Sequence, residues 1–283
     1  MAGLLSGLES LGLGNLENMD IFGKEKKEAP AKQEKKAPEV PEFKETDFIY
    51  DKAYKCPVCD HDFTAKIMKT GKAKIKKPDF DLRLVYEGGF VAEKYDVVLC
   101  PTCGYATLTR YHGAVLPTQA RLIKENITSN IVLTKYNEDT YSFEQALERY
   151  KIALACAVVK RSKASEKAFI CLKTAWLLRS YREFLEAEEG DFTELIKTLT
   201  EQEAEYHSNA YNGFIEARSS EDVPIAGMDS VTLDYLLANL AFHLKDYPTC
   251  SRMVAGILSS PSAKPRMKDK VRELKEELAK IKQ

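Results

Sequence analysis

Two short blocks of sequence, Cys56-Pro57-Val58-Cys59 and Cys100-Pro101-Thr102-Cys103, indicate how this chain folds and what it binds. Each block places two thiol side chains on one tight turn, and two such turns supply the four sulfur ligands that tetrahedral zinc prefers. Asp60 follows the first block and Gly104 the second, and both residue types tolerate the positive φ that such a turn requires. The sequence therefore predicts one Zn²⁺ per chain, bound by Cys56, Cys59, Cys100 and Cys103.

Two other interpretations of these cysteines stay open. One is a dithiol redox pair, although redox motifs of this kind normally begin a helix and these blocks are flanked by strand-like residues. The other is an iron–sulfur cluster, because cysteine spacing alone does not distinguish iron from zinc. The 40 residues between Cys59 and Cys100 exceed the spacer of about 15–20 residues that is usual in zinc motifs. His61 and His112 lie near the blocks, and we expect neither to replace a cysteine as ligand.

The long spacer between the blocks has the pattern of short strands rather than of a flexible loop. Apolar and polar residues alternate in candidate strands at 63–68, 72–76, 82–86, 95–99 and 105–109. Thr70-Gly71 suits a turn between the first two. Zinc ribbons are built from such hairpins, whose turns carry the ligands. We therefore predict a small β-rich, zinc-ribbon-like domain over residues 49–116.

From Pro117 onward the apolar residues follow a helical period. Ser142 and Gln145 form a capping box, Ser165 and Asp191 are further candidate helix starts, and a last helix follows Pro265. Residues 230–244 and 248–258 predict a helical hairpin, with small and aromatic residues in the order of a tetratricopeptide repeat. We expect an all-α, tetratricopeptide-like array over residues 117–283, which makes the chain α+β as a whole.

The last helix carries an apolar stripe that must be buried somewhere. Its members recur at heptad spacing: Met267, Val271, Leu274, Leu278 and Ile281. We expect the stripe to cap the preceding helical hairpin, which gives a monomer. Pairing with a second chain is the alternative.

The beginning of the chain differs in composition from the rest. Residues 1–23 are rich in leucine but contain five glycines, each of which lowers helix propensity by about 1 kcal/mol, so a helix there is expected only on binding a partner. Residues 24–48 form a Lys/Glu/Pro/Ala tract with few core-forming residues, which is typical of a disordered linker.

The amino-acid composition indicates the cellular compartment and the class of partner. The chain has 283 residues and a net charge of −1, so no overall field draws it to nucleic acid or to a membrane. Seven cysteines, an odd number with four in metal-type pairs, favour a reducing cytoplasm. Cys156, Cys171 and Cys250 lie among helical apolar residues and are expected to be core thiols. The sequence contains neither a secretory signal nor a run long enough to span a bilayer.

Three longer stretches of the sequence resemble one known family. They are Tyr54 to Cys59, Asp79-Phe80-Asp81-Leu82-Arg83, and Tyr95 to Ala106, which includes the second cysteine block and the Gly-Tyr-Ala that follows it. They are similar to the bacterial domain of unknown function 2225 family over roughly residues 50–257. Where that family tends to have Asn-Pro, this chain has Phe90 to Lys94. The resemblance implies an architecture and a bacterial cytoplasmic protein, but no activity.

Function is predicted from what the sequence offers and from what it lacks. It shows no nucleophile–base pair, no His-Glu-x-x-His motif and no phosphate-binding loop, so we expect no enzyme. The leading hypothesis is a zinc-binding adaptor that binds an unknown protein or peptide through its helices. A nucleic-acid-binding zinc ribbon is the alternative, since residues 52–77 are lysine-rich, and it requires those lysines to share a face with Tyr86 and Tyr95 as stacking platforms. A thiol redox sensor is the third hypothesis.

Overall fold

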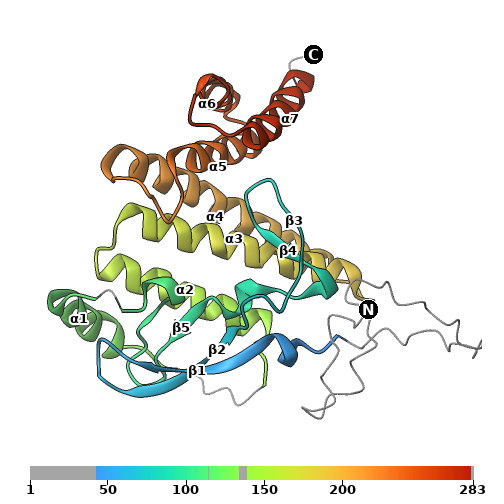
Figure 1. Ribbon diagram of the computed structural model, residues 1–283. Helices are drawn as coiled ribbons and strands as arrows, with labels where there is room; N and C mark the ends of the chain where they lie inside the picture. The colour runs from blue at the N-terminus through green and yellow to red at the C-terminus, as the bar shows by residue number, and fades with distance from the viewer. Residues whose placement is uncertain (1–42, 114, 134–138, 282–283) are drawn as a thin grey trace, which may run out of the picture. The chain divides into compact units, whose positions relative to one another are not determined.

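The computed structural model describes residues 43–113, 115–133 and 139–281. The strand region and the helices belong to one unit, which begins at Phe43. The leucine-rich segment at 1–23 and the linker up to residue 42 lie outside the described residues. The chain is α+β, as predicted: three short antiparallel hairpins come first, and helices follow from residue 117 (Figure 1).

The strands pair into three separate two-stranded sheets: β1 (Ile49–Lys55) with β2 (Asp62–Met68), β3 (Ile75–Pro78) with β4 (Leu84–Tyr86), and β5 (Val97–Leu99) with β6 (Ala106–Leu108). The turn at Thr70-Gly71 is present, but it does not join two paired strands as the alternation suggests. Instead β2 pairs back onto β1 in a register that places Lys55 opposite Asp62. The first cysteine block is therefore itself the turn of a hairpin.

Residues 43–48, assigned from the sequence to the linker, are ordered in the structure. Glu45–Phe48 form a 3₁₀ turn, η3, and the Phe48 ring stacks on Phe90 with 5.2 Å between centroids. The Glu45 carboxylate accepts hydrogen bonds from the buried Lys94 ammonium at 2.7 Å and from the Tyr95 hydroxyl at 2.9 Å. These contacts hold Glu45–Phe48 on the strand region.

The helices follow the predicted order with small shifts at their starts. They are α1 (Pro117–Ile123), continuing into one π-helical turn (Lys124–Thr128), α2 (Phe143–Val159), α3 (Ala164–Ala187), α4 (Thr193–Ser220), α5 (Ser230–His243), α6 (Tyr247–Ser259) and α7 (Pro265–Ile281). The capping box at α2 is confirmed, because Ser142 N donates to Gln145 Oε1 at 2.9 Å and Gln145 N to Ser142 Oγ at 3.2 Å. Ser165 is no cap: α3 begins one residue earlier, and the Ser165 hydroxyl donates to Glu221 Oε2 at 2.6 Å.

Packing joins the helices to one another and to the strands. Val97 and Leu108, from β5 and β6, share a core with Ala146 and Tyr150 of α2, which lies directly behind the second cysteine block. Helix α3 packs against both α2 and α4, and α5 against α6 (Figure 1). No helix in the described ranges combines the length and the apolar content needed to cross a bilayer.

The central part of the α7 stripe is buried within the same chain, whereas Ile281 at its end is 47% exposed. Val271, Leu274 and Leu278 pack with Ala238 of α5 and Cys250 of α6, and α7 contacts both helices. The last helix therefore caps the α5–α6 hairpin, which is the first of the two arrangements that the heptad pattern predicted.

Candidate metal centre

The first cysteine block is a hairpin turn closed by its own backbone. Cys56 N donates to His61 O at 2.9 Å, and Asp60 N donates back to Cys56 O at 2.9 Å. Asp60 has φ 60°, the left-handed conformation that the sequence predicts at this position. This turn directs both thiols of the block toward one point.

The second block repeats the same geometry between β5 and β6. Cys100 N donates to Tyr105 O at 2.9 Å, Gly104 N donates to Cys100 O at 3.1 Å, and Gly104 has φ 74°. A Cβ atom at Gly104 would lie 2.8 Å from Ile131 Cγ2, so space as well as φ requires glycine here. The two turns are equivalent in structure although their sequences share only the Cys-Pro-x-Cys pattern.

The four sulfur atoms converge on one site. All lie within 4.8 Å of one another, and the Cys56–Cys103 and Cys59–Cys100 pairs are each 3.6 Å apart. A tetrahedral zinc ion with Zn–S bonds of about 2.3 Å places its sulfurs about 3.8 Å apart. A disulfide needs about 2.05 Å. The spacing therefore fits four thiolates around a metal ion better than it fits two disulfides.

The sulfur atoms of the cluster shift one another's pKa. Interaction with the Cys100 sulfur raises the pKa of Cys56 to about 11 and raises that of Cys103 far above its usual value. Hydrogen bonds from Cys103 and Cys56 in turn lower the pKa of Cys100. Cys56 and Cys103 thus hold their protons firmly, and a metal ion at the centre of the four sulfurs would favour the loss of those protons.

The surroundings of the site are apolar and closed. Cys56, Cys100 and Cys103 are buried and Cys59 is half-buried, in a cluster with Val58, Phe63, Val98, Tyr105 and Ile123. Four thiolates fill a tetrahedral shell, so a metal held here has no free position for water or substrate. This arrangement is typical of structural metal sites.

The histidines near the blocks do not take part. His61 is exposed on the first turn, and the ring of His112 lies 4.8 Å from that of Tyr54. Within the part of the chain that the structure describes, the four cysteines are the one group of side chains close enough to hold a metal ion.

Cys156 is a fifth thiol beside the site, which sequence reasoning placed in the helical core. It is buried on α2, where its sulfur accepts a hydrogen bond from Ala106 N at 3.4 Å and lies 3.7 Å from Gly104 O. It contacts the backbone of the second block rather than the centre of the site. Cys171 and Cys250 are buried elsewhere among helices.

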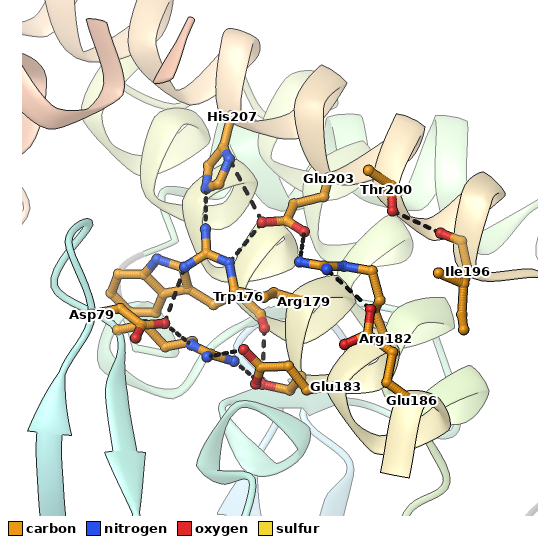
Figure 2. A network of polar contacts seen from close by, with 12 residues as sticks. Asp79, Trp176, Arg179, Arg182, Glu183, Glu186, Ile196, Thr200, Glu203 and His207 are labelled. Carbon is orange, nitrogen blue, oxygen red and sulfur yellow. Dashed lines mark hydrogen bonds and ion pairs between the residues drawn. The ribbon is translucent and has the colours of Figure 1, made fainter. Parts of the chain in front are cut away.

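A second cluster, of buried charges, has no counterpart in the sequence predictions. It joins the turn between β3 and β4 to helices α3 and α4 (Figure 2). At its centre the Arg179 guanidinium lies 2.9 Å from Asp81 Oδ2, 2.7 Å from Glu203 Oε1 and 3.1 Å from Asp79 Oδ2. His207 Nε2 lies 3.0 Å from Asp81 Oδ2. We call Asp79, Asp81, Arg179, Glu203 and His207 the charged clasp.

The electrostatics of the charged clasp are balanced by close opposite charges. Asp81 is fully buried, which alone would raise its pKa, but the hydrogen bond with His207 and the charge of Arg179 outweigh burial and hold the pKa well below the usual range. The Phe80 ring covers one side, stacked at 3.6 Å on His243 and 4.6 Å from the Arg179 guanidinium. The charged clasp thereby fastens the hairpin to the helices.

The sequence contained one signal of this cluster. Asp79 to Arg83 belongs to the stretches that carry the family resemblance, yet its alternation suggested a strand from Leu82. Leu82 instead has φ 71°, which β-branched and bulky residues rarely adopt, and the strand begins at Leu84. The signal of a buried charge cluster was the density of charge: three of the five residues from Asp79 to Arg83 are acidic or basic.

Comparison with known proteins agrees with the resemblance noted above. No curated protein and no solved structure gives a significant match. The model of a family described as an uncharacterized protein conserved in bacteria, DUF2225, matches residues 49–278, which span both cysteine blocks, the charged clasp and all seven α-helices up to Leu278. On this match the chain belongs to the DUF2225 family.

Proposed function

We propose that this protein is a zinc-binding adaptor of the bacterial cytoplasm, without enzymatic activity, that binds a protein segment through its helices. The observation that carries the proposal is a groove of about 510 Å³ along helices α2, α3 and α4, lined by apolar side chains with charged ones among them. Binding sites for protein segments combine an apolar centre with a polar rim in this way.

The metal centre supports a structural role for the ion. Its ligands are buried and fill a tetrahedral shell, and the ribbon hairpins have only small cores of their own. Small β domains of this kind depend on metal for folding. Zinc, bound once per chain by Cys56, Cys59, Cys100 and Cys103, would thus stabilise a scaffold rather than activate a substrate.

The tetratricopeptide-like character of the helices belongs to the same proposal. Ala238 and Ala241 of α5 and Cys250 of α6 are fully buried where the two helices meet. Small residues at these places allow the close helix approach on which such repeats depend. Helix α7 would serve as the terminal cap that helical arrays require.

The nucleic-acid alternative is supported by the exposed lysines but not by the tyrosines. Lys52, Lys74 and Lys76 are exposed on the hairpins, as phosphate binding requires. Tyr95, however, is 1% exposed and donates its hydroxyl to Glu45, so it offers no face on which a base could stack. The condition under which we favoured this alternative therefore fails at Tyr95.

The adaptor proposal is tested by affinity purification of the tagged full-length chain after crosslinking in cells, with and without nuclease. The expected result is a specific set of proteins that nuclease treatment does not change. Loss of the captured proteins with nuclease would favour the nucleic-acid alternative. Metal-free protein with reversible disulfides between the cysteine blocks would favour the redox sensor.

A further inference from the structure

The groove along α2, α3 and α4 has a shape that could accommodate one more helix. Helix α3 packs against both α2 and α4, so it supplies the floor, while α2 and α4 supply the two sides. Three of the four lining residues of α3 are small and buried: Ala164, Ala168 and Cys171, at the i, i+4 and i+7 positions of a single helix face; the fourth is Lys167. A floor of small side chains allows a further helix to approach closely.

The residues that line the two sides of the groove also recur at helical spacing. Helix α4 contributes Tyr206, Asn209, Gly213 and Glu216, which lie on one face, and α2 contributes Leu154 and Val158, one turn apart. From Glu205 to Glu216 the groove extends along twelve residues of α4, which is eleven steps of 1.5 Å or about 16 Å. This length accommodates about three turns of a helix.

The groove is apolar where a partner would pack. Val158, one residue before the end of α2, is 58% exposed at the edge of the groove. Gly213 lies so near Ala168 that an added Cβ would come within 2.9 Å of the Ala168 Cβ, so α3 and α4 pack closely at this point of the groove.

Charge indicates the chemistry of the partner. Glu205 and Glu216 line the groove near its two ends, are exposed, and make no ion pair with another residue in the described ranges. Lys167 of α3 is the one cation among the described lining residues. Two acidic groups three turns apart suit a helix with basic residues at both ends of its apolar stripe.

We propose that this groove binds one amphipathic helix of a partner protein, with large apolar side chains at i, i+4 and i+7 and with lysine or arginine about three turns apart. The proposal rests on the adaptor function and identifies the class of segment that the adaptor takes. The partner's large side chains fill the small-residue floor, its aliphatic face covers Val158, and its basic residues pair with Glu205 and Glu216.

The test uses fluorescent designed peptides of roughly 18 residues, about 27 Å as a helix. One carries a leucine stripe flanked by lysines, and its matched partner carries glutamates in place of the lysines. Fluorescence anisotropy with the full-length chain should show the lysine peptide binding at least about tenfold more tightly. Val158→Lys should weaken it at least about tenfold, and the double variant Glu205→Lys, Glu216→Lys should bind the glutamate peptide in preference.

Two variants control for general effects of the substitutions. Ile75→Lys changes an apolar residue of similar exposure, 54%, on β3, and Glu201→Lys reverses a charge on α4 one turn outside the groove. Both should bind the lysine peptide as the wild type does. Circular dichroism of every variant confirms that it is folded.

Several results would overturn the proposal. They are equal binding of both peptides, an unchanged affinity in Val158→Lys, or a charge reversal that does not invert the preference. Binding that appears only after removal of residues 1–42, or a dimer in light scattering that Val158→Lys dissociates, would assign the groove to the chain itself or to a second copy. If cellular crosslinks persist in Val158→Lys, the adaptor function stands and this site for it is wrong.

Discussion

The guanidinium of Arg179 on α3 lies 2.9 Å from the carboxylate of Asp81 in the β3–β4 turn, and 98 residues of chain separate them. Both side chains are almost fully buried. A buried pair of this kind contributes little net energy when intact but costs several kcal/mol when one partner is removed, since the remaining charge is left without a counterion.

Arg179 keeps the carboxylates of Glu203 and Asp79 when Asp81 is replaced, so Asp81→Asn should destabilise the protein by about 1.5–3 kcal/mol, the usual contribution of a hydrogen bond to a charged group. Chemical denaturation followed by circular dichroism measures the change. Asp51→Asn is the matched control: it breaks the Lys66–Asp51 pair at 3.2 Å, where Asp51 is largely exposed, and should cost about 1 kcal/mol or less. Similar losses in the two variants would contradict this account of the charged clasp.

The same pair predicts a dependence of stability on pH. The pKa of Asp81 is lower in the folded state than in the unfolded chain, where an aspartate titrates near about 3.9. The stabilisation is then complete above about pH 5 and is lost as the pH falls toward the folded pKa. Between about pH 5 and pH 2 the free energy of unfolding should fall more steeply in the wild type than in Asp81→Asn. If the free energy of unfolding depended on pH in the same way in both proteins, the lowered pKa of Asp81 would be contradicted.

Metal content tests the candidate centre directly. Protein purified without chelator should contain about one zinc per chain by mass spectrometry of the metal, and Cys100→Ser should contain almost none, since one of four ligands is lost. Cys156→Ser should keep its metal, because that thiol hydrogen-bonds the backbone of Gly104 and Ala106 and lies outside the group of four converging sulfurs. Finding iron at full occupancy would keep the site and change its metal.

The backbone of the second block provides an independent test. Gly104→Ala places a Cβ atom 2.8 Å from Ile131 and imposes a φ of 74° on a residue that disfavours it, at a cost of about 1–2 kcal/mol for φ alone. Gly71→Ala imposes the same φ, 77°, but meets no atom within 4 Å. Gly104→Ala should lose zinc to a chelator much faster than Gly71→Ala. Equal rates would show that the close contact with Ile131 does not matter.

Burial of the last helix predicts a large effect from one substitution. Leu274→Asp places a charge without a partner among Ala238, Cys250 and Val254, and should lower the free energy of unfolding by at least about 3 kcal/mol. Lys275→Asp, exposed on the same helix, should be nearly neutral. An unmoved melting temperature in Leu274→Asp would mean that α7 does not pack on α5 and α6 in solution.

The sequence predicted the parts of the molecule that depend on neighbouring residues. The cysteine blocks were recognisable because each places two ligands and a turn residue, Asp60 or Gly104, within a few positions. The α2 capping box was recognisable for the same reason, since Ser142 and Gln145 are three residues apart. The cysteine cluster needed only one long-range inference, namely that the two similar turns meet.

Features that depend on distant residues could not be predicted in this way. The partner of β2 is set by the first cysteine turn, whereas residues 72–76 had an equally good alternation and lay closer to an ordinary turn. The charged clasp joins Asp81 to His207 across 126 residues, and no local pattern in α3 or α4 marks Arg179 as its centre. Likewise the groove could not be predicted, because its lining residues come from three helices that the sequence does not place together.

The charged clasp has a consequence for how relatives within the family can be recombined. A chimaera that takes the strand region of one member and the helices of another inherits Asp79 and Asp81 from one parent and the equivalents of Arg179, Glu203 and His207 from the other. Such a chimaera should fold only when both parents carry matching charges, so that crossovers between β4 and α3 are tolerated in some pairs and lethal to the fold in others. The charged clasp thus restricts which strand regions and which helical regions of the family can be combined in one folded protein.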